Sequence, residues 1–172
     1  FTKKWMEISN DETFNRWQQI FIYETHYKPL YNKIMTTFSN NKLFKNMTPS
    51  DEEALIEMCI SLSVQHNGAF RIFQMALIKD YTSCSNEEIL DKENKDCSAE
   101  RSEIPPINNK NQKQIEEMQS MANEITMSEF IDRVYAARKV YVKTYNIPDW
   151  ENMVKNRYTK EPNKLKEKLG YK

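Results

Sequence analysis

Apolar residues recur three and four positions apart along most of the chain, which is the spacing of an amphipathic α-helix. In the first part of the sequence these positions are Phe14, Trp17, Phe21, Leu30, Ile34 and Phe38. Pro29 interrupts this pattern, and because proline lacks the backbone N–H that a helix interior uses, we expect a kinked or restarted helix there.

Helix starts are marked by residues that can cap a free backbone N–H. Thr48 precedes Pro49 and an acidic run, and Thr126 stands three residues before Glu129, as in a capping box. The helix after Thr48 ends at Asn67-Gly68, where a second helix follows at once. This spacing predicts an antiparallel helix pair over residues 48–81. Further helices are expected near residues 115–125, 126–145, 150–154 and 162–169.

Residues 82–112 show a different composition, rich in Ser, Asn, Asp, Glu and Lys and interrupted by Pro105-Pro106. Only Ile89 and Leu90 offer much apolar surface, so a long, mobile, acidic loop is expected. We therefore predict a single helical domain over residues 1–172. It would comprise an N-terminal helical half (1–81), the loop (82–112) and a C-terminal helical half (113–172).

The chain has 172 residues but only two glycines. Sheets with tight turns need more glycine than this, whereas a bundle needs it mainly at helix ends. The predicted fold is therefore an all-α helical bundle of about six to eight helices with a long acidic loop. No apolar run approaches the roughly 20 residues of a membrane-spanning helix, so no membrane partner is expected.

Catalytic and metal-binding motifs are absent from the sequence. Two glycines cannot build a phosphate-binding loop, and His26 and His66 lack neighbours at metal-ligand spacing. Cys59 falls on an apolar helix face and is expected in the core. We predict a protein that is not an enzyme and has no catalytic residue, metal or cofactor. An enzyme or effector with no recognisable motif stays open as an alternative, which a buried polar pocket around His26 or Cys59 would favour.

Three cysteines form an odd, sparse set, which does not suggest disulfides. Cys84 and Cys97 fall in the predicted loop, so their spacing is given no weight. A reducing, intracellular location is the simpler interpretation.

Nine methionines and the helix pair at residues 48–81 favour protein binding, because methionine adapts to irregular apolar partners. We predict a non-catalytic scaffold that docks short amphipathic helices in an apolar groove between this pair and the helix near residues 130–145. The candidate partner-binding residues are Leu55, Met58, Leu62, Phe70, Phe73 and Leu77.

A second hypothesis is a nucleic-acid contact. The net charge is zero, which disfavours strong phosphate binding, but residues 126–172 hold eleven Lys and Arg against six Asp and Glu. The candidate phosphate-contacting residues are Arg138, Lys139, Lys143, Lys155 and Arg157. Nucleic acid is therefore possible as a partner but not favoured.

Two segments resemble one known family. One is the helix pair with Ala54-Leu55-Ile56, Asn67-Gly68-Ala69 and Ala76-Leu77; the other runs from Ile147-Pro148-Asp149-Trp150 to Leu165-Lys166-Glu167-Lys168-Leu169-Gly170. They resemble the C-terminal protein-interaction domain of the telomere-associated repressor-activator proteins. The family has an acidic pair after the Trp where this chain has Asn152-Met153. The resemblance implies an all-helical module that recruits silencing factors at telomeres or chromatin in the nucleus.

Overall fold

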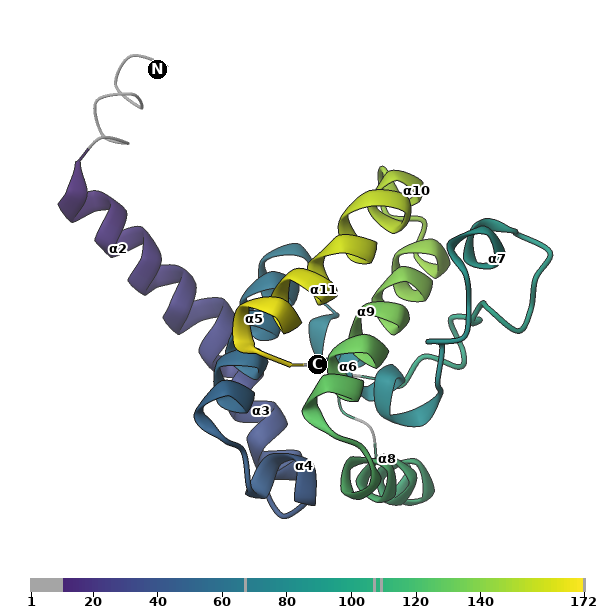
Figure 1. Ribbon diagram of the computed structural model, residues 1–172, viewed down its shortest axis with the longest axis horizontal. Coiled ribbons are helices and arrows are strands. Elements are labelled where there is room, and N and C mark those ends of the chain that lie inside the picture. The colour runs from purple at the N-terminus through teal and green to yellow at the C-terminus, as the bar shows by residue number, and fades with distance from the viewer. Residues whose placement is uncertain (1–10, 67, 107, 109, 172) are drawn as a thin grey trace.

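The computed structural model describes residues 11–66, 68–106, 108 and 110–171. Within these residues the chain forms helices and connecting loops and no β-strand (Figure 1). This confirms the predicted all-α class. When contiguous helical elements are counted together, the described part contains eight helical segments, within the predicted range.

The first helical segment is continuous from α2 (Glu12–Ile22) through the π-helical η1 (Tyr23–Tyr27) to α3 (Lys28–Phe38). The Asp11 carboxylate begins it by accepting the N–H groups of Thr13 and Phe14. Pro29 lies in the first turn of α3, directly after the π-helical turn. The expected kink or restart is therefore a local change of helix type, which removes the need for a backbone hydrogen bond from proline.

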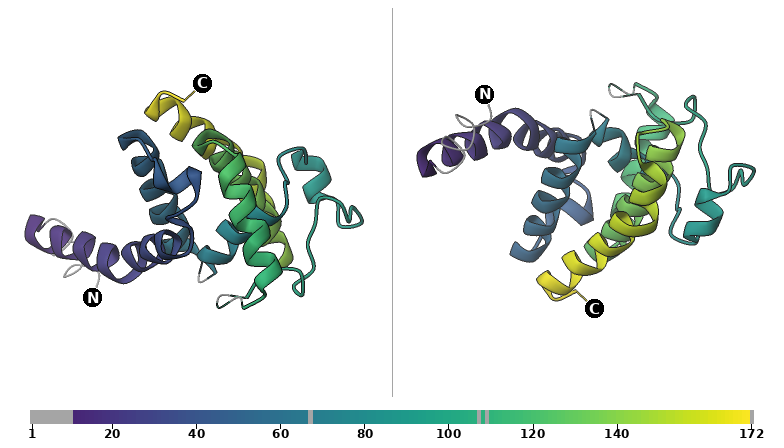
Figure 2. Two further views of the ribbon diagram at one scale, coloured as in Figure 1. Left: turned by 90° about the horizontal axis from the view of Figure 1, so that it is seen from below. Right: turned by 90° about the horizontal axis from the view of Figure 1, so that it is seen from above.

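The centre of the molecule is formed by α5 (Pro49–Gln65), α6 (Ala69–Ile78) and α9 (Met127–Thr144), with α6 packed closely against α9. Two further helices cover this centre: α8 (Gln112–Glu124) packs on α6, and α11 (Tyr158–Leu169) packs along α9 (Figure 2). The short elements are α4 (Lys42–Lys45), α7 (Asn86–Leu90), α10 (Trp150–Asn152) and the π-helical η2 (Met153–Arg157).

Phe130 on α9 lies at the middle of the apolar core. Its ring contacts Phe44 edge-on at 5.6 Å between centroids and Phe73 of α6 at 5.8 Å. Ile34 and Leu55 are likewise fully buried, so α3 and α5 share one core with α9. Burial of these side chains supplies the main drive for the helices to pack.

The predicted helix starts at Thr48 and Thr126 are confirmed. The Thr48 N–H donates to the Asp51 carboxylate at 2.9 Å while the Thr48 hydroxyl accepts the Asp51 N–H. Thr126 and Glu129 repeat the arrangement at α9, where the Thr126 N–H lies 2.7 Å from the carboxylate. Each box satisfies backbone donors that a helix start leaves open.

The turn between α5 and α6 depends on glycine for a reason that the sequence pattern did not indicate. Gly68 has an ordinary negative φ of −102° and precedes α6, so it is not a left-handed C-cap. A Cβ atom there would lie 2.0 Å from the Tyr141 hydroxyl of α9. Glycine is thus needed for the close approach of α9. Asn67, the other residue of the predicted cap, lies outside the described residues.

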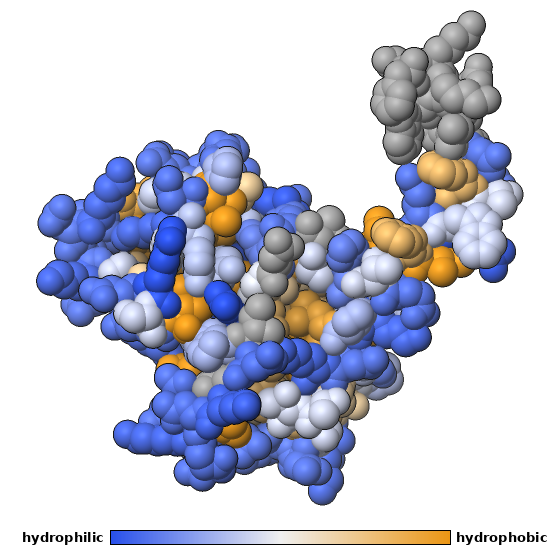
Figure 3. Space-filling view, turned by 180° about the vertical axis from the view of Figure 1, so that it is seen from behind, coloured by the Kyte–Doolittle hydropathy of each residue, from blue (hydrophilic) through white to orange (hydrophobic). Residues whose placement is uncertain are grey.

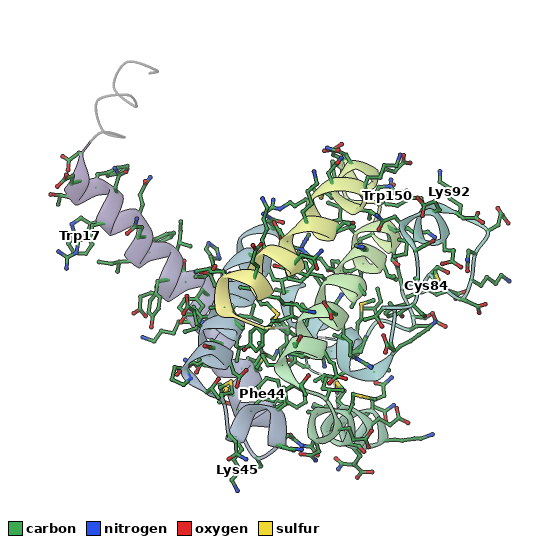
Figure 4. The ribbon with its side chains drawn as sticks, viewed as in Figure 1. Trp17, Phe44, Lys45, Cys84, Lys92 and Trp150 are labelled. Carbon is green, nitrogen blue, oxygen red and sulfur yellow. A yellow bond between two sulfur atoms is a disulfide. The ribbon has the colours of Figure 1, made fainter. Side chains whose placement is uncertain are left out.

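Residues 79–111 hold a disulfide, contrary to expectation. Cys84 and Cys97 are bonded, with their Cα atoms 5.7 Å apart, and the bond closes a loop that contains α7 (Figure 4). Ile89, Cys97 and Ile104 are buried against the helices. The prediction that the cysteines form no disulfide was wrong, because the spacing of two loop cysteines gives no indication of their separation in space.

Candidate functional site

The predicted groove residues lie inside the protein. Leu55, Met58 and Leu62 of α5 are at most 1% exposed, and the α6 residues among the six candidates are also buried. Those α6 residues are Phe70, Phe73 and Leu77. These side chains face other helices of the same chain, so they form the core and do not line a groove. The prediction failed because an apolar stripe looks the same whether its partner is an internal or an external helix.

The five candidate phosphate-contacting residues do not form one basic surface. Arg138 is fully buried, and the ammonium groups of Lys139 and Lys143 donate to Asn86 Oδ1 and to the Asp91 carbonyl, respectively. Arg157 is exposed but pairs with Glu161. Of the five candidates, Lys155 alone is exposed and takes part in none of the ion pairs found in the described residues. Most of the basic excess of residues 126–172 therefore serves contacts within the domain.

Arg138 is the centre of a buried polar cluster that the sequence analysis did not find. Its guanidinium donates to the Glu161 carboxylate at 3.1 Å, to the Ser61 carbonyl at 3.2 Å and to the Gln65 side-chain oxygen. It also stacks over the Tyr158 ring at 4.1 Å. A fully buried arginine is costly unless its donors are used, and here α5 and α11 supply the acceptors.

His66 completes this cluster, and its neutral ring has one defined tautomer. Its Nε2 accepts a hydrogen bond from Arg138 Nε at 3.2 Å, so the proton of the neutral ring is on Nδ1, a buried atom with no hydrogen-bond partner. Burial, followed by the charge of Arg138 and of Arg157, lowers the pKa of His66 to about 4. The ring is therefore neutral near pH 7 and acts as an acceptor for Arg138.

Cys59 and His26, the two residues named for the alternative of an enzyme, do not form a polar pocket. Cys59 lies in the apolar core, and burial raises the pKa of its thiol far above its ordinary value. His26 is exposed on η1, where its ring contacts Phe21 edge-on at 6.5 Å. In the described part of the chain no group of three or more His, Cys, Asp and Glu side chains could hold a metal ion.

An exposed apolar surface occurs on α2, at helically spaced apolar positions for which the sequence predicted no functional role. Trp17 is 65% and Phe21 is 63% exposed, and none of the α2 residues is buried. Figure 1 shows α2 projecting away from the other helices, and Figure 4 shows Trp17 far from Phe44 in the core. The space-filling view shows apolar atoms on this projecting arm (Figure 3).

We call this surface the α2 apolar face and define it by its large exposed side chains. These are Trp17, Ile20, Phe21 and Ile22 of α2 and the adjoining Tyr23 of η1. Single exposed apolar residues are common, but two large exposed aromatic rings one helical turn apart, as in Trp17 and Phe21, are typical of an interaction surface. It is the candidate functional site of the described residues.

A comparison with protein families decides what kind of protein carries this surface. Residues 1–117 match the family described as the C-terminal region of VgrG3-like spike proteins of the type VI secretion system. The chain belongs to this family. The match includes α2 through α7 and the beginning of α8. No curated protein and no solved structure matches the chain.

Membership of a secretion spike family corrects the resemblance to telomere-associated repressor-activator proteins, which was wrong. The expected roles in telomeres, chromatin and silencing, and the nuclear, intracellular location, are wrong with it. The apolar stripes and the short turn that suggested the resemblance are general requirements of packed helix pairs, so they did not identify a family.

One of the partner predictions can be stated more firmly. A domain of a type VI secretion spike protein implies protein partners. Across the residues for which the structure gives positions, no helix is long and apolar enough to cross a membrane.

Proposed function

We propose that this chain is a domain that a type VI secretion spike protein transports as part of its own polypeptide. We also propose that the α2 apolar face contacts the rest of the spike. The observation that supports the proposal most directly is a helix with two exposed aromatic residues in a chain of the spike family. The family describes a C-terminal region, so in its members the preceding spike polypeptide joins on the N-terminal side. This is the side on which α2 lies.

The proposed occupant of the α2 apolar face is an apolar surface of that preceding spike polypeptide. α2 carries one acid, Glu12, and one base, Arg16, so charge contributes little to its choice of partner. Apolar burial would then dominate binding, with Trp17 and Phe21 as the main anchors. An amphipathic helix of the spike, laid along α2, would satisfy this chemistry and agrees with the kind of partner that the sequence predicts.

We further propose that the described residues act by binding and not by catalysis. The buried thiol of Cys59 is protonated, His66 accepts from Arg138, and Glu161 is paired with Arg138 and Arg157. Nucleophilic or acid–base catalysis needs such a group to be available to a substrate. In this proposal the domain provides a binding surface, and the rest of the spike protein provides transport.

Hydrogen–deuterium exchange on the full spike protein tests the docking surface. We compare the wild type with a Trp17→Glu, Phe21→Glu double variant, because a carboxylate on each anchor would be desolvated by an apolar partner. The expected result is slow exchange of the α2 amides in the wild type and at least about tenfold faster exchange in the variant.

Gln19→Glu is the matched control, since Gln19 is exposed on the same helix at a position turned away from Trp17 and Phe21. It should keep the slow exchange of the wild type. Fast α2 exchange in the wild-type spike would refute the proposal. So would protection that appears only as the protein concentration rises, because the occupant would then be a second copy of the chain.

A further inference from the structure

A small pocket lies between α9, the start of α11 and the loop after α6. The residues that line it are far in sequence from those of the α2 apolar face. The volume of the pocket is about 240 Å³. This is smaller than the roughly 300–1,000 Å³ of pockets that take drug-sized ligands, so any occupant has few heavy atoms. The walls include Tyr81, Cys84, Tyr135, Lys139, Tyr158 and Thr159.

Lys139 gives this pocket its charge. Its ammonium group donates to Asn86 Oδ1 at 2.9 Å, which is a neutral acceptor, and none of the ion pairs found in the described residues includes it. Desolvation by burial lowers the pKa of Lys139. A half-buried ammonium with a neutral partner gains from an added anion, because it has three donors and an incompletely balanced charge.

The other charged group in the wall is already balanced. The carboxylate of Asp132 pairs with Lys166, with Oδ2 and Nζ 2.7 Å apart. The tyrosine hydroxyl of Tyr158 is engaged with the polar cluster, since it lies 3.3 Å from His66 Nε2. The pocket therefore offers aromatic ring surfaces and one cation, which is the composition that suits an oxyanion on a compact ligand.

The position of Lys139 is fixed by neighbours on three elements. Asn86, which accepts from it, donates in turn to the Thr159 hydroxyl at 3.0 Å, and that hydroxyl donates to the Val154 carbonyl at 2.8 Å. Asn86 lies within the loop that the Cys84–Cys97 disulfide closes. A cation held in this way requires little reorganisation when a ligand binds.

We propose that this pocket binds a small oxyanion, a carboxylate or a phosphate group, with the Lys139 ammonium as its ion partner. The site is separate from the surface proposed to contact the spike and does not depend on that function. Asn86 positions the lysine, and the rings of Tyr81, Tyr135 and Tyr158 limit the size of the ligand.

Titration of the chain with inorganic phosphate and, separately, with benzoate tests the site at constant ionic strength. Binding is followed by the backbone amide resonances of residues 135–139 and 158–159. The expected result is saturable shifts for at least one of the two anions. The anion that binds with the higher affinity identifies the ligand class. In Lys139→Met the affinity should fall about tenfold or more, as expected for a lost charge-assisted hydrogen bond.

Two further variants make the outcome decisive. Lys155→Met removes an exposed lysine outside the pocket and should bind as the wild type does. Asn86→Asp keeps Lys139 but places a carboxylate beside it, so it should weaken anion binding as much as Lys139→Met. The proposal is overturned if neither anion gives saturable shifts, if Lys139→Met binds as the wild type does, or if Lys155→Met weakens binding equally.

Discussion

The helices α2 and α9 both have an amphipathic pattern and a side-chain cap at the N-terminus, yet they differ completely in their surroundings. Twelve residues of α9 are buried, whereas none of α2 is. α9 packs against α6 and α11, and α2 extends into solvent before the chain turns into η1 (Figure 1). An apolar helical stripe therefore shows that a helix needs a partner, but it does not show whether that partner belongs to the same domain.

The two helices also use charge differently. α9 buries two arginines, Arg133 and Arg138, and each reaches acceptors on another helix or loop. Arg133 donates to the Ala76 carbonyl at 2.7 Å and to Asp80 at 3.0 Å. Such contacts specify one arrangement of α9 against its neighbours, whereas the two charged side chains of α2, Glu12 and Arg16, are exposed.

The largest difference between the helices should appear when one phenylalanine in each is shortened. Phe130→Ala in α9 removes a fully buried ring that contacts Phe44 and Phe73, and it should lower the free energy of unfolding by about 3–5 kcal/mol. Phe21→Ala in α2 removes a ring that is 63% exposed and should change it by about 0.5 kcal/mol or less. Urea denaturation followed by far-ultraviolet circular dichroism measures both.

Equal destabilisation by the two substitutions would contradict the comparison, because it would mean that α2 is packed in the isolated chain. A change in the slope of unfolding with urea would indicate altered compactness and not a simple loss of packing.

A smaller but still large effect is expected from Arg138→Met, which keeps much of the side-chain length but removes the donors to Glu161, Gln65 and the Ser61 carbonyl. We expect a loss of about 2–4 kcal/mol. The loss of stability is limited because Glu161 retains Arg157 as an ion partner. Urea denaturation again gives the value, and Arg157→Met is the matched control on the exposed side of the same carboxylate.

If Arg157→Met were as damaging as Arg138→Met, the stability would depend on neutralising Glu161. The contacts of the buried guanidinium with α5 would then contribute little.

The fold was predictable to the extent that it depends on neighbours in sequence. Thr48 with Asp51 and Thr126 with Glu129 mark helix starts correctly, because capping is decided within four residues. The scarcity of glycine excluded a sheet. What the sequence could not show was whether an amphipathic face is covered, so Leu55 and Phe73 were assigned to a groove although they are buried, and no surface role was predicted for Trp17, which is exposed.

The polar cluster and the disulfide were missed for the same physical reason. His66 and Arg138 are 72 positions apart, and Arg138 and Glu161 are 23 apart, so no local pattern brings them together. The basic residues Arg138, Lys139 and Lys143 of α9 were assigned to a phosphate-contacting surface, although Arg138 has no exposed side-chain surface. One signal was available: Arg138 lies four residues from both Val134 and Val142, within the apolar side of the helix.

The most specific consequence of the buried α9 cluster is a dependence of stability on pH. His66 is neutral when folded because burial, together with the charge of Arg138, lowers its pKa from 6.5 to about 4. As the pH falls below 6.5, the unfolded chain takes up the proton and the folded chain does not, so stability decreases down to about pH 4. His66 should account for a loss of about 2–3 kcal/mol over this range.

His66→Gln separates this contribution from the carboxylates that titrate in the same range, since glutamine can still accept from Arg138 but does not bind the proton. The unfolding free energy of the variant, measured by urea denaturation between pH 4 and 7, should fall less steeply than that of the wild type. His26→Gln, on the exposed η1 segment, controls for the loss of an imidazole and should follow the wild type. Parallel pH profiles for the wild type and His66→Gln would contradict this expectation. They would show that His66 binds its proton as readily in the folded chain as in the unfolded chain. The buried cluster around Arg138 would then be open to water far more than its hydrogen bonds indicate.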